Sequence, residues 1–169
     1  MTFRLAGSLP SELLVELKAR LGQNDSARTI ANARVQKFPI KEIEKILDAG
    51  HGPNHMAQPE IADLVERALR AFDGVRYKLF AWCVMPNHVH VVFQALGEWG
   101  LAQILHSWKS YTARQAQRKF EIRGAFWQRE YYDHLIRDNE QFTRAVKYVA
   151  ENPVRAGLEG WRWVGIAPR

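Results

Sequence analysis

The sequence is poor in cysteine and contains no long hydrophobic run. Cys83 is the only cysteine among 169 residues, which excludes an internal disulfide and a cysteine-rich zinc site. No stretch approaches the roughly 20 apolar residues that span a bilayer. Residues 1–10 also lack an apolar segment long enough for a signal peptide. We therefore expect a cytoplasmic protein with no membrane partner.

Acidic residues are the minority among the charged side chains. The chain has 18 Asp and Glu against 24 Lys and Arg, which gives a net charge of +6. This excess favours an anionic partner, and nucleic acid is the commonest such partner of a soluble chain. Internal repeats, low-complexity segments and linkers are absent from the sequence. At this length and with 47% hydrophobic residues, we expect one domain over residues 1–169.

Hydrophobic periodicity predicts alternating strands and helices. Strands are expected at residues 2–6, 75–84, 88–93 and 126–136, and helices from Ser11 onward, at 39–49, 60–72, 101–120 and from Asp138 to Asn152. The last helix is expected to end at Asn152 because a proline disfavours α geometry in the residue before it. Residues 22–58 are interpreted as a helical insertion, and residues 156–169 as an irregular C-terminal tail.

The element order favours an α+β fold. The strands on either side of Met85–Asn87 are close enough in sequence to form an antiparallel hairpin. We expect a ferredoxin-like antiparallel sheet, covered by helices on one side.

The most informative segment is the apolar run Trp82–Phe93, which contains His88-Val89-His90. Successive side chains of a strand point to opposite faces, so His88 and His90 project from the same face. Two imidazoles are costly to bury but suit a divalent metal ion well. Taken alone, such a short motif is more often a pair of hydrogen-bonded strand histidines than a metal site.

A second pair of residues lies on the last predicted helix. Tyr148 and Asn152 are four residues apart and therefore share one face of that helix. The amide oxygen of Asn152 suits a hard divalent ion, and a phenol beside a metal-polarised phosphate can attack the phosphorus. With the two histidines and the basic charge, this pair is consistent with phosphodiester chemistry.

Three segments together resemble a known family. Residues 85–90, Met-Pro-Asn-His-Val-His, resemble the HUH motif of the single-tyrosine transposases, in which U is a hydrophobic residue. Residues 126–134 and 148–158 resemble the segments that mark the REP-associated tyrosine transposases, and the resemblance extends from about Thr2 to Trp163. It implies an HUH motif on a central strand and a tyrosine on a C-terminal helix.

The resemblance also implies a site and a reaction. His88, His90 and Asn152 would hold Mg²⁺ or Mn²⁺, with Asn152 where related insertion-sequence transposases carry glutamine. Tyr148 would attack single-stranded DNA, leaving a 5′-phosphotyrosine and a free 3′-OH that allows strand transfer. The implied targets are hairpins of repetitive extragenic palindromes (REP) in the bacterial nucleoid. Members of this family complete the site within one chain, so a monomer is expected rather than a dimer.

The predicted helix 101–120 offers an alternative nucleophile. Tyr111 and Gln115 repeat the tyrosine–glutamine spacing, although Tyr111 is also interpreted as a DNA-facing or core residue. The candidates for DNA contact are Lys109, Arg114, Arg118 and Arg129; the alternative is a solvated basic face. Trp108 and Trp127 would either stack on bases or pack in the core.

Two other functions remain open at this stage. The first is a catalytically silent protein that binds DNA hairpins in a sequence-specific manner. The second is a nickase of the replication-initiator type, which the short chain and the lack of a helicase segment disfavour.

Overall fold

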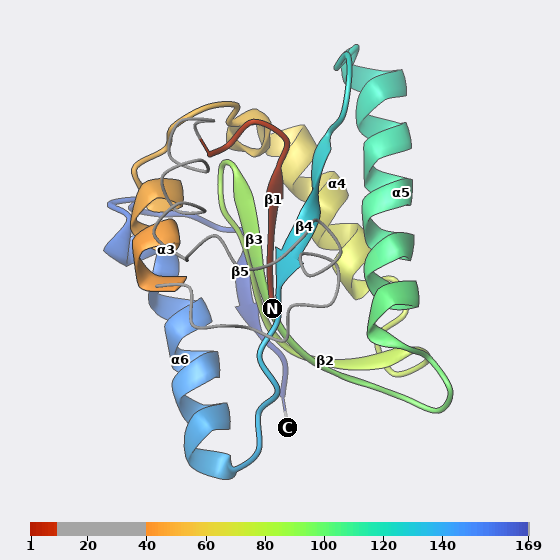
Figure 1. Ribbon diagram of the computed structural model, residues 1–169, viewed down its shortest axis with the longest axis vertical. Helices are drawn as coiled ribbons and strands as arrows, with labels where there is room; N and C mark the ends of the chain where they lie inside the picture. Colours follow the sequence, from red (N-terminus) through yellow and green to blue (C-terminus); the bar gives the residue numbers. More distant parts are fainter. Residues whose placement is uncertain (10–39, 169) are drawn as a thin grey trace, which may run out of the picture.

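The computed structural model describes residues 1–9 and 40–168 (Figure 1). The helix expected from Ser11, and residues 22–39 of the expected insertion, lie outside the described residues. The described elements are β1 (Thr2–Leu5), α3 (Ile40–Asp48), the 3₁₀ helix η1 (His55–Ala57), α4 (Pro59–Arg70), β2 (Tyr77–Val84), β3 (His88–Ala95), α5 (Leu101–Phe120), β4 (Trp127–Tyr132), α6 (Asn139–Arg155) and β5 (Val164–Ile166).

The strands form one five-stranded sheet in the order β4-β1-β3-β2-β5. Every pairing is antiparallel, and β3 is the middle strand. β2 and β3 form the expected hairpin, which is closed by a hydrogen bond from the Met85 amide to the His88 carbonyl at 2.8 Å. The α+β fold with an antiparallel sheet is therefore confirmed.

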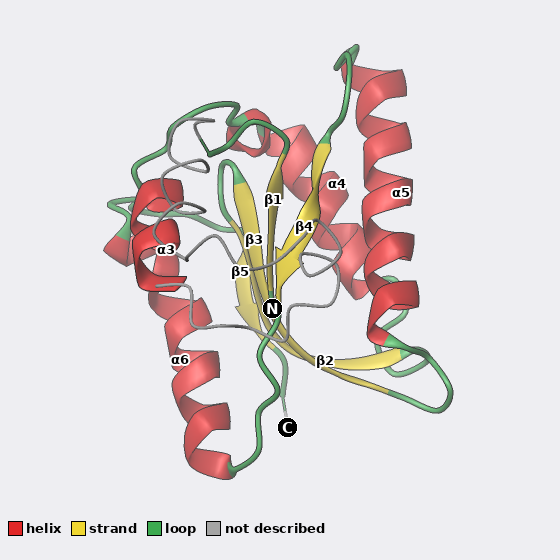
Figure 2. Ribbon diagram, in the orientation of Figure 1, coloured by secondary structure: helices red, strands yellow, loops and turns green. Residues whose placement is uncertain are grey.

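Helices cover both faces of this sheet, and the expectation of a single covered face was wrong. Figure 2 shows α4 and α5 on one side of the strands and α3 and α6 on the other. The reason lies in β2 and β3, which are buried without alternation between the faces from Ala81 to Val84 and from His88 to Val92. A strand that is apolar on both sides needs a cover on each of them.

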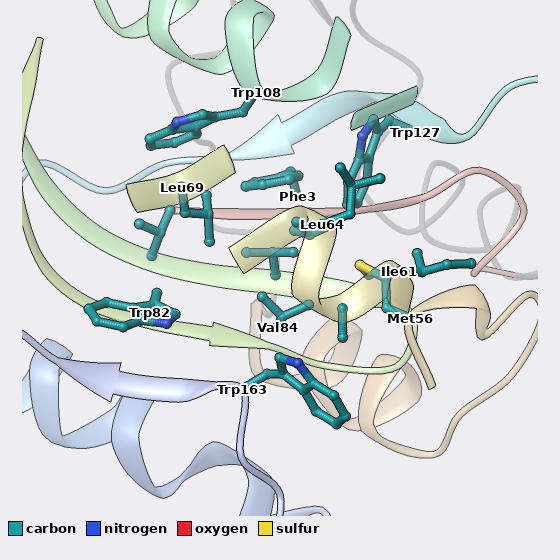
Figure 3. Close-up of a cluster of buried hydrophobic side chains, with 14 of the residues drawn as sticks. Phe3, Met56, Ile61, Leu64, Leu69, Trp82, Val84, Trp108, Trp127 and Trp163 are labelled. Carbon is teal, nitrogen blue, oxygen red and sulfur yellow. The ribbon is translucent and has the colours of Figure 1, made fainter. Parts of the chain in front are cut away.

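The larger core lies between the sheet and the helices α4 and α5. Figure 3 shows Phe3 of β1 beside Trp108 and Trp127. The ring centroids of Phe3 and Trp127 are 4.9 Å apart, and those of Phe3 and Trp108 are 6.4 Å apart. Both tryptophans are less than 10% exposed, at 2% and 8%. They therefore pack in the core and are not free to stack on bases.

The C-terminal tail contains a strand, which corrects the expectation of an irregular segment at 156–169. β5 pairs with β2, and Gly165 lies opposite Trp82. A Cβ at Gly165 would lie 2.3 Å from the Trp82 indole, so only glycine lets this ring cover the strand. The Trp161 indole also donates to the Val84 carbonyl at 2.7 Å. These non-local contacts order a segment that has little periodicity of its own.

α6 continues past the residue where the sequence predicted its end. The helix runs to Arg155 with Pro153 inside it, and the Ala156 amide still donates to the Asn152 carbonyl at 3.0 Å. A proline in a helix removes one backbone hydrogen bond. Burial of the apolar side chains of Val149 and Pro153 offsets this loss. Among residues 1–9 and 40–168, no helix is long and apolar enough to cross a membrane.

Candidate active site

His88 and His90 lie side by side on β3, on the face that α6 covers. They are 1% and 2% exposed, respectively. Their Nε2 atoms are 2.9 Å apart, and their ring planes are nearly perpendicular at 86°. The strand alternation predicted from the sequence thus brings the two imidazoles together at one point inside the molecule.

Asn87 determines which nitrogen of His88 carries the proton. Its amide nitrogen donates to the Leu47 carbonyl of α3 at 2.9 Å, so its amide oxygen faces His88. That oxygen lies 2.7 Å from His88 Nδ1, which must therefore be the donor. The Nε2 atom of His88 is left with a lone pair directed at His90.

Thr2 of β1 holds the second histidine. The register of β1 on β3 places Thr2 opposite His90, and the Thr2 hydroxyl lies 2.8 Å from His90 Nδ1. A hydroxyl can donate or accept. When His90 carries its proton on Nε2 and donates it to His88, the Thr2 hydroxyl can donate to Nδ1 of His90. When His90 carries its proton on Nδ1, the hydroxyl can accept it, and the Nε2 lone pairs of both histidines are then available to a cation.

Replacing Thr2 by valine is expected to weaken Mn²⁺ binding by about tenfold, because partners of metal-bound histidines contribute on this scale. Thr2→Ser, which keeps the hydroxyl, should bind Mn²⁺ like the wild type. Isothermal titration calorimetry of the three proteins measures the difference. Equal affinity of Thr2→Val and the wild type would contradict a role for this hydroxyl.

Tyr148 of α6 lies beside the second histidine. The ring centroids of Tyr148 and His90 are 5.4 Å apart with the planes at 88°, and the guanidinium of Arg155 lies 5.0 Å from the Tyr148 ring centroid. A cavity of about 150 Å³ lies beside them and is also lined by Tyr132 and His134. The structure thus brings Tyr148 and the histidine pair together next to an open space.

Asn152 lies one turn beyond Tyr148 and is 1% exposed. In the part of the chain that the structure describes, neither its amide oxygen nor its amide nitrogen has a hydrogen-bond partner. A buried amide without partners costs about 1–3 kcal/mol. Such a group is expected where a ligand supplies the missing interaction.

The residues fit a divalent cation. Burial lowers the pKa of His88 to about 3 and that of His90 well below its usual value, so both imidazoles are neutral and can act as ligands. An octahedral ion with bonds of about 2.1 Å separates adjacent ligands by about 3 Å, close to the observed 2.9 Å. Within the described residues, no three His, Cys, Asp or Glu side chains are already arranged as a metal site, so the two imidazoles need a further oxygen donor, and the amide oxygen of Asn152 is one candidate.

Tyr111 does not join this cluster. It is 47% exposed on α5, which packs on the opposite face of the sheet from α6. Gln115 follows it on the same helix and is half-buried. Of the two tyrosines that precede a side-chain amide by four residues, the structure therefore brings Tyr148 to the histidines.

The four basic residues proposed to contact DNA differ in their exposure and in whether their charged groups already bond within the fold. Arg114, Arg118 and Arg129 are exposed, and the Arg114 Nε donates to the Ser110 carbonyl at 3.2 Å. Lys109 instead ties α5 to β4, because its ammonium group donates to the carbonyls of Gln128 and Arg129 at 2.8 and 3.2 Å. Its charge is therefore engaged within the fold.

Lys109 is expected to make the unfolding free energy depend on pH in the alkaline range. Burial, together with the charge of Arg4, lowers its pKa from 10.5 to about 8, against the opposing effect of Glu130. Between pH 8 and 10.5 the unfolded chain holds this proton more strongly, so its contribution to the unfolding free energy rises with pH. Lys109→Met should lack this rise in urea unfolding at pH 7.5 and 10. Equal pH dependence of the two proteins would refute the assignment.

Sequence reasoning missed four residues of the site: Thr2, Asp48, Asn87 and Arg155. Asn87 stands next to His88 within the recognised motif, and its position there was an available signal. Arg155 lies seven residues after Tyr148, a spacing that shares a helix face, but the sequence predicted the helix to end at Asn152. Thr2 and Asp48 reach the site only through strand register and helix packing.

Two curated proteins of Haemophilus influenzae resemble the chain. An uncharacterized protein is 28% identical over 105 residues, and one provisionally named a REP-associated tyrosine transposase is 27% identical over 92 residues. These matches cover 49% and 48% of this chain and 57% and 52% of the relatives. The chain thus spans about half the length of the curated relatives it matches.

A solved structure has the same fold. It is described as the REP-associated tyrosine transposase bound to a REP hairpin, and it matches with a TM-score of 0.50 at 20% identity. The match covers 64% of this chain and 62% of that one. The sequence pattern of the family described as "Transposase IS200 like" matches residues 54–152, more than half of the chain. The chain therefore belongs to the IS200-like transposase family.

Proposed function

We propose that the chain is a metal-dependent endonuclease and strand transferase that acts on single-stranded DNA at palindromic hairpins, as a single catalytic domain. The observation that carries this proposal is the contact between Tyr148 and His90 beside a cavity of about 150 Å³. A phenol next to two neutral, metal-competent imidazoles can carry out phosphodiester transfer through tyrosine.

His88, His90 and Asn152 would hold Mg²⁺ or Mn²⁺. When bound, the ion would polarise the scissile phosphate. The Tyr148 oxygen forms a bond to phosphorus as the bond from phosphorus to the 3′ oxygen breaks. The phenolic proton leaves to water, the 3′ oxygen takes a proton from water, and the product is a 5′-phosphotyrosine. Attack by a second 3′-OH reverses these steps, which joins two strands without an external energy source.

Arg155 supports the same chemistry. Its guanidinium lies over the Tyr148 ring, where a phosphodiester would bring negative charge. The exposed side chains of Arg114, Arg118 and Arg129 would hold the flanking DNA, and Lys109 would position β4 behind them. The hairpin target is supported by the solved relative, which is bound to a REP hairpin.

We also propose that the active form is a monomer. Tyr148 and His90 of the same chain are in contact. The nucleophile therefore needs no second subunit to reach the histidines.

The test is formation of a covalent adduct by the full chain. Oligonucleotides that fold into palindromic hairpins with single-stranded flanks are labelled at either the 5′ or the 3′ end and incubated with Mn²⁺ or EDTA. On a denaturing protein gel, we expect the 3′ label to shift to the protein in Mn²⁺ only, while the 5′ label is released as a free fragment. An oligonucleotide of equal composition without a palindrome is the control.

Two outcomes would overturn the proposal. Transfer of the 5′ label to the protein would reverse the polarity of the reaction. Hairpin binding without any adduct in Mn²⁺ or Mg²⁺ would identify a catalytically silent hairpin-binding protein instead.

A further inference from the structure

The strongest unexplained group near the site is a carboxylate outside the segment that matches the family. Asp48 is the last residue of α3, and its Oδ1 atom lies 3.7 Å from Nε2 of His88. The family match begins at residue 54. Asp48 thus comes from a part of the chain for which the family relationship predicts no role.

α3 is tied directly to the histidine strand. The carbonyl of Leu47 accepts the hydrogen bond from the Asn87 amide nitrogen, and the oxygen of the same amide accepts from His88 Nδ1. Leu47 itself is 1% exposed in a small core with Leu9 and Ile43. The position of Asp48 beside His88 therefore follows from buried packing and a two-step hydrogen-bond chain.

The Asp48 oxygen near His88 has nothing to bond to in the protein. Across residues 1–9 and 40–168, this Oδ1 is inaccessible to solvent and lacks a hydrogen-bond partner. His88 Nε2 cannot supply a proton, because His88 carries its proton on Nδ1. Two acceptors, an oxygen and a nitrogen, thus face each other at 3.7 Å.

Asp48 and His90 both approach the Nε2 atom of His88. The Nε2 atoms of the two histidines are 2.9 Å apart, and the carboxylate oxygen lies beside one of them. A proton of His90 can lie between the two imidazoles, but none lies between the Asp48 oxygen and His88 Nε2, and this buried oxygen is unfavourable unless a cation approaches it. The same cation would meet the unpartnered amide of Asn152, which shares its face of α6 with Tyr148.

We infer that Asp48 is a further oxygen ligand of the divalent ion, supplied by α3. This inference rests on the proposed metal-dependent function. Two imidazoles and an amide are all neutral, and such a set favours zinc, copper or nickel over magnesium or manganese. A carboxylate adds the negative charge and the hard oxygen that Mg²⁺ and Mn²⁺ prefer. Asp48 would therefore shift the preference of the site toward Mn²⁺ and Mg²⁺.

The surrounding charges are compatible with this role. Arg155 is the cation that interacts with Asp48, and Cys83 of β2 lies on the same side of the sheet. Burial and the charge of Asp48 raise the pKa of the Cys83 thiol.

The test measures Mn²⁺ binding to the full chain without DNA, by the loss of the free-ion signal in electron paramagnetic resonance. We expect Asp48→Asn to weaken Mn²⁺ binding by at least about tenfold, a loss that even an outer partner of a metal ligand can cause. Zn²⁺ binding should fall less. Glu151→Gln is the matched control, because it removes the same charge from an exposed residue that pairs with Lys147 at 3.7 Å.

Thermal unfolding separates this role from a structural one. In EDTA, Asp48→Asn should be about as stable as the wild type, because the side chain is 25% exposed and its buried oxygen has no hydrogen-bond partner in the described part of the protein. The rise in melting temperature with Mn²⁺ should be smaller in the variant. A less stable variant that binds Mn²⁺ like the wild type would show a structural role and overturn the inference.

His88→Ala distinguishes the inference from the function on which it rests. Loss of Mn²⁺ binding in His88→Ala with wild-type binding in Asp48→Asn would refute the role of Asp48 alone. Wild-type Mn²⁺ binding in His88→Ala would refute the proposed metal site as a whole.

Discussion

Tyr148→Phe is expected to abolish the covalent DNA adduct and to lower cleavage by at least about 1,000-fold, the scale seen when a nucleophile is removed. The substitution deletes only the oxygen that would attack phosphorus. The ring that packs against His90 and under Arg155 remains. Hairpin binding, Mn²⁺ affinity and the unfolding free energy should therefore stay near their wild-type values.

Tyr111→Phe is the matched control for this experiment. It removes the same atom from a tyrosine with the same helical spacing to a polar residue, on the other side of the sheet. The adduct is quantified with 3′-labelled hairpin DNA in Mn²⁺ for both variants and the wild type. An adduct that persists in Tyr148→Phe but disappears in Tyr111→Phe would transfer the nucleophile to α5.

Gly52→Ala is expected to destabilise the protein by about 3 kcal/mol or more, which places it among the severe single substitutions. Gly52 has a φ of +75°, in the left-handed region that disfavours other residues. The Cβ that the substitution adds at this position would also lie 2.3 Å from the carbonyl oxygen of Gly7. Backbone cannot rotate away as a side chain can, so the loop itself would have to move.

Gly50→Ala isolates the conformational part of this effect, so the difference between the two variants measures the steric part. Gly50 has a φ of +73°, and no described atom lies within 4 Å of the Cβ position. We expect a loss of about 1 kcal/mol from the backbone conformation alone. Urea unfolding in EDTA compares the two variants. Equal losses would show that the approach to Gly7 carries no energetic weight.

Gly52→Ala should also affect the site. The same loop contains His51, whose carbonyl accepts a hydrogen bond from Asn87 at 3.5 Å, and Asn87 orients His88. Movement of the loop would disturb this chain. Mn²⁺ affinity is therefore expected to fall in Gly52→Ala and to remain in Gly50→Ala.

Local sequence patterns were sufficient for much of the architecture. Periodicity predicted α5 at Leu101–Phe120 with its observed bounds, and the β2–β3 hairpin around Met85–Asn87. Strand alternation predicted that His88 and His90 share a face, and helical spacing predicted the same for Tyr148 and Asn152. These relations hold within one element, where backbone geometry alone determines which side chains are neighbours.

The errors arose where distant segments decide the outcome. β5 forms because Gly165 can lie under the Trp82 ring, and α6 passes Pro153 because the helix is buried against the sheet. Neither fact follows from local propensity, which tertiary packing overrides. The covered second face of the sheet likewise required knowing that β2 and β3 are buried on both sides.

The sequence by itself thus determined most of the elements, the histidine pair, and Tyr148 as the preferred nucleophile with Tyr111 as the alternative. Only the tertiary structure brought Tyr148 to His90, kept Tyr111 on the opposite face, and added Thr2 and Asp48 from the N-terminal part of the chain. The physical reason is that spacing along a helix identifies a face but not what the face meets. Strand register and the packing of α3 and α6 on the sheet decide that contact.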